Sequence, residues 1–130
     1  MNAETLQDAV ALIVEDHVAV RLALRERIQT SFGQFRLHEA GTVNEALKIV
    51  ETEKVDIVFM DIRLPGTDGV DGTRMVLARS PHTSVVVVSG LDDASHRSAA
   101  RRAGASAFVS KRAIGRELIP AIESLVNCAQ

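Results

Sequence analysis

The chain has little of what several classes of protein depend on. It contains one cysteine in 130 residues, which excludes a disulfide framework or a cysteine-based metal site within one chain. Tryptophan and tyrosine are absent and aromatic residues make up 3% of the sequence, so the stacking platforms that bind single-stranded nucleic acid are missing. What remains is the composition of an ordinary globular domain, with 46% hydrophobic and 25% charged residues.

The charge balance and the hydrophobic runs argue against two further kinds of partner. The formal net charge is −2, which gives no electrostatic reason for the whole domain to bind DNA. No apolar run approaches the length of a membrane span, and the N-terminal segment carries Glu4 and Asp8 where a signal sequence would be basic. We therefore expect a cytoplasmic protein that binds neither nucleic acid nor a membrane through this domain.

Five strand-like segments alternate with five helical patterns along the chain. The strands are expected at residues 10–14, 35–40, 57–60, 84–88 and 106–110. Strands that alternate with helices over short connections predict a parallel sheet covered by helices on both faces. Right-handed crossovers with a switch point between the first and third strands give the strand order 2-1-3-4-5. The expected fold is therefore α/β, a doubly wound, flavodoxin-like (βα)5 sandwich that forms one domain over residues 1–130.

Local signals predict where individual helices begin. Thr42 followed by Glu45 fits a capping box and predicts a helix start. The third helix is expected to start near Asp68, and Gly69 and Gly72 are each expected to weaken it by about 1 kcal/mol relative to alanine if they lie in its interior. Pro120 is expected in or near the first turn of the last helix, because the missing amide hydrogen of a proline costs least there.

Polar side chains follow four neighbouring strands at the point where each strand ends. They are Glu15 and Asp16 after the first strand, Asp61 after the third, Ser89 after the fourth and Lys111 after the fifth. Because the carboxyl ends of parallel strands meet at one edge of the sheet, these groups should converge on one shallow cleft. Three crowded carboxylates need a cation, and oxygen ligands with room for water suit Mg²⁺. Asp61 is then a candidate nucleophile for forming an acyl phosphate, with Lys111 and Ser89 available to phosphoryl oxygens.

Four motifs around these residues resemble the receiver domain of two-component response regulators. They are Ile-Val-Glu-Asp-His at 13–17, Met-Asp-Ile-Arg-Leu-Pro-Gly-Thr-Asp-Gly at 60–69, Val-Val-Ser-Gly at 87–90 and Phe-Val-Ser-Lys at 108–111. The resemblance covers essentially the whole chain. It implies that Asp61 accepts a phosphoryl group from a histidine of a sensor kinase or phosphotransfer protein, and that the domain is no enzyme beyond assisting its own phosphorylation and dephosphorylation.

The same resemblance implies a set of metal ligands. Asp16 and Asp61 would bind Mg²⁺ directly, together with the backbone carbonyl of Arg63. Glu15 would act largely through water. The four histidines, at positions 17, 38, 82 and 96, lack metal-ligand spacing and are expected at the surface.

The resemblance further implies a conformational switch. Ser89 and Phe108 match the switch pair of the family, in which the hydroxyl turns toward the phosphoryl group and the aromatic ring moves inward. Gly90 matches the small residue that keeps the phosphoryl group accessible. The family often has a proline with a cis peptide bond after the lysine, but Arg112 follows Lys111 here. We predict a trans bond, because a cis bond before a residue other than proline costs about 3–4 kcal/mol.

Six basic residues fall within twenty positions on the predicted fourth and fifth helices and between them. They are Arg97, Arg101, Arg102, Lys111, Arg112 and Arg116. Such a run is more often a solvated face than an interface, whereas in receivers the face of the fourth helix, fifth strand and fifth helix commonly contacts an output domain or a partner. Both interpretations stay open. We expect the switch to act through this face on an output domain, a partner or a second copy, in transcriptional regulation. The alternative is a stand-alone receiver or phosphorelay intermediate that acts through protein–protein contacts.

Three other functions are disfavoured. Phosphohydrolases with an aspartate nucleophile carry the motif Asp-x-Asp after their first strand. Here the residue two positions after Asp61 is Arg63, so the second acid of that motif is missing. A flavin- or dinucleotide-binding domain needs a glycine-rich first turn, and the segment 15–17 has no glycine and puts negative charge there. A receiver-like module that is never phosphorylated is disfavoured by the intact acidic set.

Overall fold

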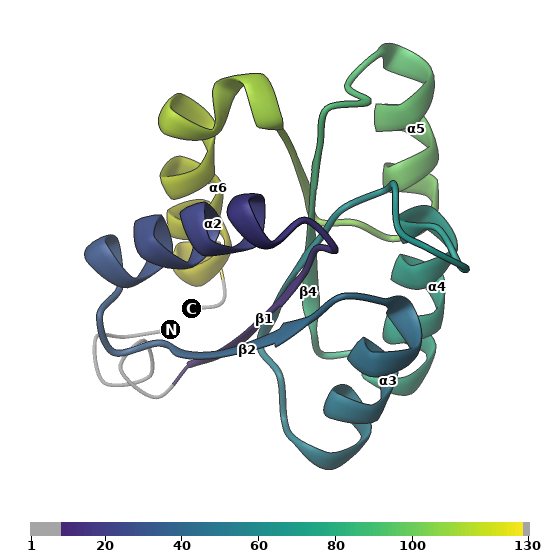
Figure 1. Cartoon of the computed structure of the whole chain (residues 1–130), viewed down its shortest axis with the longest axis horizontal. Coiled ribbons are helices and arrows are strands. Elements are labelled where there is room, and N and C mark those ends of the chain that lie inside the picture. The colour runs from purple at the N-terminus through teal and green to yellow at the C-terminus, as the bar shows by residue number, and fades with distance from the viewer. Residues whose placement is uncertain (1–8, 129–130) are drawn as a thin grey trace.

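The structure, a computed structural model, describes residues 9–128 as five strands alternating with helices (Figure 1). The strands are β1 (Val10–Val14), β2 (Arg36–Ala40), β3 (Ile57–Met60), β4 (Ser84–Ser89) and β5 (Ala107–Ser110). The helices are α2 (Val18–Ser31), α3 (Val43–Thr52), α4 (Gly69–Arg79), α5 (Ala94–Arg102) and α6 (Ile114–Cys128), with a 3-10 turn, η1 (Lys111–Ala113), before the last. None of the helices in this part of the chain has both the length and the apolar character needed to cross a lipid bilayer.

The five strands form one parallel sheet in the order β2-β1-β3-β4-β5, as predicted. Helices α2 and α6 cover one face, and α3, α4 and α5 cover the other (Figure 1). Along β1, Leu12 and Val14 belong to the core beneath α3–α5, while Ala11 and Ile13 belong to the core beneath α2 and α6. Each fully buried Val, Leu or Ile side chain contributes about 1.5–3 kcal/mol, so both cores hold the helices to the sheet.

The edge strand β2 is the most polar of the five. Arg36 is exposed, and its guanidinium lies 3.5 Å from Glu53 at the end of α3. Glu39 forms ion pairs with two residues of α2, with Arg21 at 2.9 Å and with Arg25. The charged side chains of this edge are thus tied to the helices on both faces of the sheet.

Two helix starts follow the predicted local signals. The Thr42 hydroxyl accepts a hydrogen bond from the Glu45 amide at 3.1 Å, as the capping pair predicts for α3. The Asp68 carboxylate accepts hydrogen bonds from the amides of Val70 and Asp71 at the start of α4. Both side chains satisfy amide groups that have no partner inside the helix.

The prediction for Pro120 is wrong, because this residue lies inside α6 and not in its first turn. The helix begins earlier than its apolar pattern indicates. The Ser110 hydroxyl accepts a hydrogen bond from the Arg112 amide at 3.2 Å, and the resulting turn η1 leads directly into α6. Proline in a helix leaves the carbonyl four residues before it without an amide partner. That carbonyl belongs to Arg116, which is exposed like Pro120, so water can take the place of the missing donor.

Helices α3 and α4 approach closely at a glycine. A Cβ atom at Gly72 of α4 would lie 2.7 Å from a methyl group of Val43 on α3 and 3.2 Å from the Met60 methyl group on β3. Val43 is β-branched and stiff, so it cannot easily give way. The glycine that lowers the helix propensity of α4 therefore permits the packing of α4 against its neighbours.

We expect Gly72→Ala to lower the free energy of unfolding by about 1–2 kcal/mol, because overpacking against Val43 outweighs the gain in helix propensity. Denaturant-induced unfolding followed by circular dichroism measures this change. Gly115→Ala near the start of α6 is the matched control, since a Cβ atom there would meet only the Arg27 guanidinium, at 3.7 Å. It should leave stability unchanged or raise it by up to about 1 kcal/mol. Equal effects of the two changes would contradict the packing argument.

Candidate functional site

Two buried carboxylates lie at the carboxyl ends of β1 and β3. The Glu15 amide donates to the carbonyl of Ala40 at 3.0 Å, and the Asp61 amide donates to the carbonyl of Val14 at 3.1 Å. These bonds extend the sheet by one residue and fix where both side chains start. Glu15 is 1% exposed and Asp61 is 4% exposed, whereas Asp16, the third acid predicted at this edge, is exposed. The predicted convergence at this edge is thus present.

Lys111 joins the two buried carboxylates. Its Nζ atom lies 2.7 Å from Oε1 of Glu15 and 3.1 Å from Oδ2 of Asp61, to which it donates a hydrogen bond. The contact with Glu15 is the shorter of the two, and it pairs the buried Oε1 atom with the ammonium. The lysine from the end of β5 therefore reaches the acids after β1 and β3, as the sequence predicts.

The charges of this cluster shift one another's titration. Burial, and then the negative charge of Glu15, raise the pKa of Asp61. Burial also acts to raise the pKa of Glu15, but the ammonium of Lys111 and the amide of His17 outweigh it and lower that pKa. The opposite directions agree with the distances, since Lys111 lies nearer to Glu15. Burial acts to lower the pKa of Lys111, but the two carboxylates outweigh it, so the pKa is raised and the ammonium stays charged.

A cavity of about 310 Å³ opens beside Asp61. It is lined by His17, Asp61, Arg63, Ser89, Gly90, Leu91 and Lys111. A Cβ atom at Gly90 would meet nothing within 4 Å, so this side of the cavity is open. The Ser89 side chain is buried, and its hydroxyl accepts a hydrogen bond from the amide of Leu91 at 3.1 Å. The predicted hydroxyl thus lies at the cavity but is engaged with its own loop.

The predicted switch residue Phe108 lies in β5 and does not line this cavity. Its ring is half-buried on the α3–α5 side of the sheet, and the Arg97 guanidinium lies 4.7 Å from the ring centroid. The peptide bond between Lys111 and Arg112 is trans, as predicted.

A glycine holds the loop after Asp61 against the start of α4. The Gly69 amide donates to the carbonyl of Ile62 at 2.8 Å. A Cβ atom at Gly69 would lie 1.8 Å from the Asp61 carbonyl oxygen, a distance that no side chain can occupy. Glycine at this position therefore allows the loop to close and fixes the backbone of Asp61 relative to α4.

Sequence reasoning missed His17 as a neighbour of the acidic pair. The residue is exposed, as expected of the histidines, but its Nδ1 atom lies 3.2 Å from Glu15 and 3.3 Å from Asp16. The three residues offer ligand atoms that all lie within 4.8 Å of one another. The signal was a tight turn directly after the strand, in which the His17 amide donates to Oε2 of Glu15 at 3.1 Å.

The donors at this edge fit a hard divalent cation. Glu15 and Asp61 share one ammonium, and Asp16 adds a third carboxylate whose ligand atom lies within 4.8 Å of that of Glu15. Mg²⁺ prefers oxygen ligands and keeps several waters, for which the exposed Asp16 leaves room. Arg63, whose carbonyl is the remaining predicted ligand, lines the same cavity as Asp61. The imidazole of His17 is the one donor of the group that suits Mg²⁺ poorly.

Comparison with known proteins identifies the family. A family model described as the response regulator receiver domain matches residues 11–123. The chain belongs to the response-regulator receiver family. Transcriptional regulatory protein PdtaR of Mycobacterium tuberculosis is 34% identical over 116 residues, which cover 89% of this receiver and 56% of that protein. The uncharacterized transcriptional regulatory protein YhcZ of Bacillus subtilis is 33% identical over 108 residues, which cover 83% of this receiver and 50% of that protein.

Solved structures agree with this assignment. A two-component response regulator of the LuxR family from Aurantimonas sp. superposes with a TM-score of 0.86 at 30% identity, over 92% of this receiver and 86% of that chain. A CheY-like receiver domain protein from Methanospirillum hungatei superposes with a TM-score of 0.81 at 25% identity, over 92% and 94% of the two chains. The predicted fold and family are confirmed. The receiver spans about half the length of the curated relatives it matches.

We expect Asp61→Asn to stabilise the metal-free receiver at neutral pH. Because the pKa of Asp61 is raised in the folded state, the stability linked to this group is present below its unfolded pKa and is lost as the pH rises through the folded pKa. The ionised carboxylate thus costs stability at pH 7. Replacing it should raise the melting temperature by a few degrees, or about 1 kcal/mol. Millimolar Mg²⁺ should then stabilise the wild type more than the variant.

Thermal unfolding with Mg²⁺ and with a chelator measures both effects. Asp68→Asn is the control, because Asp68 is exposed and asparagine can also cap α4. Its melting temperature and its response to Mg²⁺ should match the wild type. A melting temperature of Asp61→Asn below that of the wild type, or an equal response of Asp61→Asn and the wild type to Mg²⁺, would contradict the electrostatic account.

Proposed function

We propose that this receiver accepts a phosphoryl group on the Asp61 carboxylate from a phosphohistidine of a sensor kinase or phosphotransfer protein. The observation that carries the proposal is the position of Asp61 at the cavity, with Lys111 Nζ at 3.1 Å. A buried carboxylate with a cation beside it and open space before it is suited to attack phosphorus and to have its product neutralised.

The transfer follows from the groups around the cavity. An Asp61 oxygen attacks the phosphorus atom in line with the leaving imidazole, so that an O–P bond forms as the N–P bond breaks. The imidazole takes a proton from solvent, and the product is an acyl phosphate. Lys111 then pairs with a phosphoryl oxygen, and the Ser89 hydroxyl leaves the Leu91 amide to donate to another. Gly90 keeps the approach open.

The resident ion that fits this site is Mg²⁺. Asp16, Asp61 and the backbone carbonyl of Arg63 would hold it, with Glu15 acting through water. When bound, it supplies positive charge for the phosphoryl oxygens. Glu15 has a further task, because its ion pair with Lys111 keeps the ammonium beside Asp61.

The output of the switch is proposed to lie on the face of α5, β5 and α6. When Ser89 turns toward the phosphoryl group, the ring of Phe108 moves inward and changes this face. It would then regulate an output domain, a partner or a second copy in transcription, which the names of the relatives PdtaR and YhcZ support. The receiver would act in the cytoplasm and catalyse nothing beyond its own phosphorylation and dephosphorylation.

Incubation with acetyl phosphate and Mg²⁺ tests the phosphoacceptor directly. Intact-protein mass spectrometry should detect the addition of one phosphoryl group to the wild type. Asp61→Asn should show none, and Asp68→Asn should match the wild type because it removes a nearby carboxylate outside the cluster. Chelation of Mg²⁺ should abolish the modification. Phosphorylation of Asp61→Asn to the wild-type extent would refute the assignment of Asp61.

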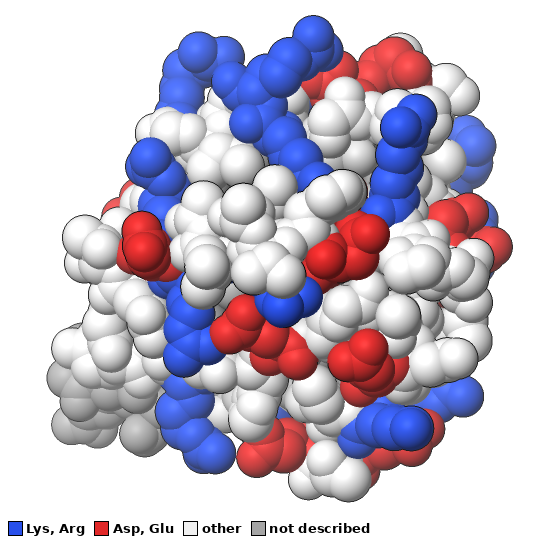
Figure 2. All heavy atoms as spheres, in the orientation of Figure 1, with Lys and Arg blue, Asp and Glu red and all other residues white. Residues whose placement is uncertain are grey.

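The surface beside the cavity suggests how a donor docks. A groove of about 790 Å³ runs between α2 and the start of α6, and Lys111 lines both this groove and the cavity at Asp61. Val18 and Leu22 also lie on α2, outside the lining of the groove, and are 59% and 49% exposed. Figure 2 shows uncharged atoms on the front of the molecule where α2 lies, with Lys and Arg side chains, and some Asp and Glu, along the top of the view. An amphipathic helix with acidic residues beside its phosphohistidine fits this surface.

We expect Leu22→Asp to slow phosphotransfer from a histidine donor by about tenfold, a loss typical of one apolar anchor. Modification by acetyl phosphate should not change, because a small donor needs no docking surface. The assay uses purified catalytic fragments of the sensor kinases encoded in the source genome. Ala78→Asp on α4 is the control, since Ala78 is also exposed but lies on the opposite face of the sheet. Equal rates for the Leu22 variant and the wild type would exclude this surface.

A further inference from the structure

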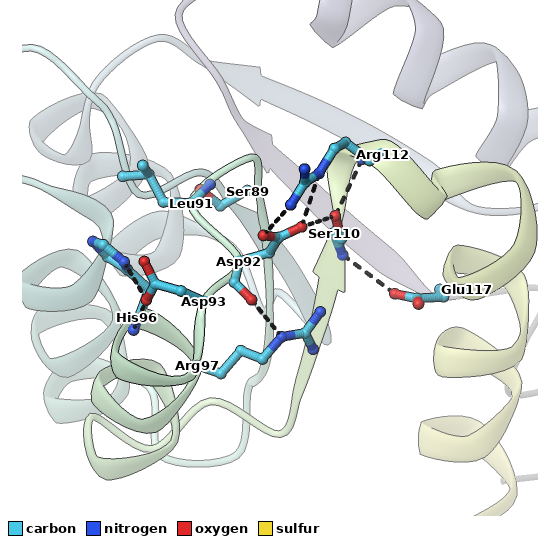
Figure 3. A network of polar contacts seen from close by, with 9 residues as sticks. All are labelled: Ser89, Leu91, Asp92, Asp93, His96, Arg97, Ser110, Arg112 and Glu117. Atoms are coloured by element: carbon cyan, nitrogen blue, oxygen red, sulfur yellow. Dashed lines mark hydrogen bonds and ion pairs between the residues drawn. The ribbon is translucent and has the colours of Figure 1, made fainter.

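The Asp92 carboxylate joins two loops that come from different strands (Figure 3). Its Oδ2 atom accepts a hydrogen bond from the Ser110 hydroxyl at 2.5 Å and one from Nε of Arg112 at 3.2 Å. Its Oδ1 atom accepts a bond from the second guanidinium nitrogen at 2.5 Å. The carboxylate is 15% exposed, while the Arg112 side chain is 78% exposed and lies over it. We call these three residues the Asp92 clasp.

The clasp lies directly beside the phosphorylation site. Asp92 is three residues after Ser89, in the loop between β4 and α5. Ser110 and Arg112 stand on either side of Lys111 in the sequence, at the junction of β5 and η1. The clasp therefore ties the loop that follows the switch hydroxyl to the segment that carries the lysine of the site.

The same loop also restrains the aromatic switch residue. Arg97 in α5 donates from Nε to the backbone carbonyl of Asp92 at 2.8 Å (Figure 3). Its guanidinium lies 4.7 Å from the centroid of the Phe108 ring, within the range of a cation–π contact. A displacement of Asp92 would therefore pull on the group that holds the ring in its half-buried position.

The carboxylate of the clasp is charged at physiological pH. The hydrogen bonds from Ser110 and Arg112 hold the pKa of Asp92 below its usual range. The bonds that close the clasp are accordingly charge-assisted, and the two from Arg112 form a fork that constrains direction as well as distance. A shift of the loop that the Arg112 side chain does not follow would break that geometry.

We propose that the Asp92 clasp is a restraint that holds the receiver in its unphosphorylated arrangement and opens when Asp61 is phosphorylated. The Ser89 hydroxyl anchors the start of the 90–93 loop by accepting from the Leu91 amide, so when it turns toward a phosphoryl oxygen this anchor is lost and the loop can shift away from Arg112. Part of the free energy released when Asp61 is phosphorylated is therefore used to open the clasp. This inference rests on the proposed function and adds the element that sets the balance between the two arrangements.

Affinity for beryllium fluoride, which with Mg²⁺ stands in for a phosphoryl group, tests the restraint. Asp92→Asn and Arg112→Ala should each bind beryllium fluoride about two- to fivefold more tightly than the wild type, in keeping with the modest strength of a partly exposed ion pair. The double variant should gain no more than either single change, because both remove the same restraint. Titration followed by amide NMR measures the apparent affinities and also reports whether each variant is folded.

Matched controls lie next to the clasp. Asp93→Asn changes the neighbouring carboxylate, which caps α5 by accepting from the His96 amide and takes no part in the clasp. Arg101→Ala removes an exposed arginine of α5. Both should bind beryllium fluoride as the wild type does. If the wild type binds beryllium fluoride and both clasp variants bind it with equal or lower affinity, the clasp is refuted and the proposed function is not. If the wild type does not bind beryllium fluoride, the proposed function and the clasp are both refuted.

The opening of the clasp can be observed at the arginine itself. The Nε–H signal of Arg112, identified by its loss in Arg112→Lys, should shift in Asp92→Asn because its acceptor is altered. Beryllium fluoride should move the wild-type signal toward the position it has in Asp92→Asn. A signal that stays in place when amides at Ser89 and Leu91 shift would show that the clasp remains closed, and would refute its opening.

Discussion

One ammonium group holds the ends of three strands together. Lys111 follows β5 and reaches Glu15 after β1 and Asp61 after β3, across the end of the intervening strand β4. Leaving one partner of a buried ion pair alone costs about 3–5 kcal/mol, so two buried carboxylates at this edge depend on the lysine. The contact that makes the cluster tolerable in the folded protein also places a positive charge where new negative charge would develop. Stability and chemistry at this edge therefore have the same physical origin.

Much of the fold could be predicted because parallel strands leave a simple trace in a sequence. Strands covered on both faces are uninterrupted apolar runs, and residues 57–60 and 85–88 are the clearest of them. Capping residues such as Thr42 and Asp68 add local signals that act within one turn. Pro120 was misplaced because the start of α6 depends on the Ser110 hydroxyl and on η1, whose residues carry no apolar periodicity. A helix start set by a preceding turn leaves no pattern of its own.

The residues of the candidate site likewise divide into those that the sequence predicts and those that it does not. Glu15, Asp61 and Lys111 were predictable because each is the first or second polar residue after a buried run, and the sheet brings such residues to one edge. Contacts made between loops were not predictable, since they depend on how far each loop turns back. Asp92 meets partners 18 and 20 positions away, and no spacing rule relates them. Phosphorylation, the metal and the switch remain predictions, because they concern states that geometry alone does not contain.

The charged edge strand bears on how this domain avoids associating with other chains. The outer side of β2 presents backbone groups that are free to pair with another strand, as any sheet edge does. Ion pairs from Glu39 to α2 and from Arg36 to the end of α3 place charged side chains along this edge and hold them there. A strand approaching from outside would have to strip water from these charges before it formed a ladder. Growth of the sheet into a fibre is therefore opposed at β2, and association through the surfaces of the helices is not.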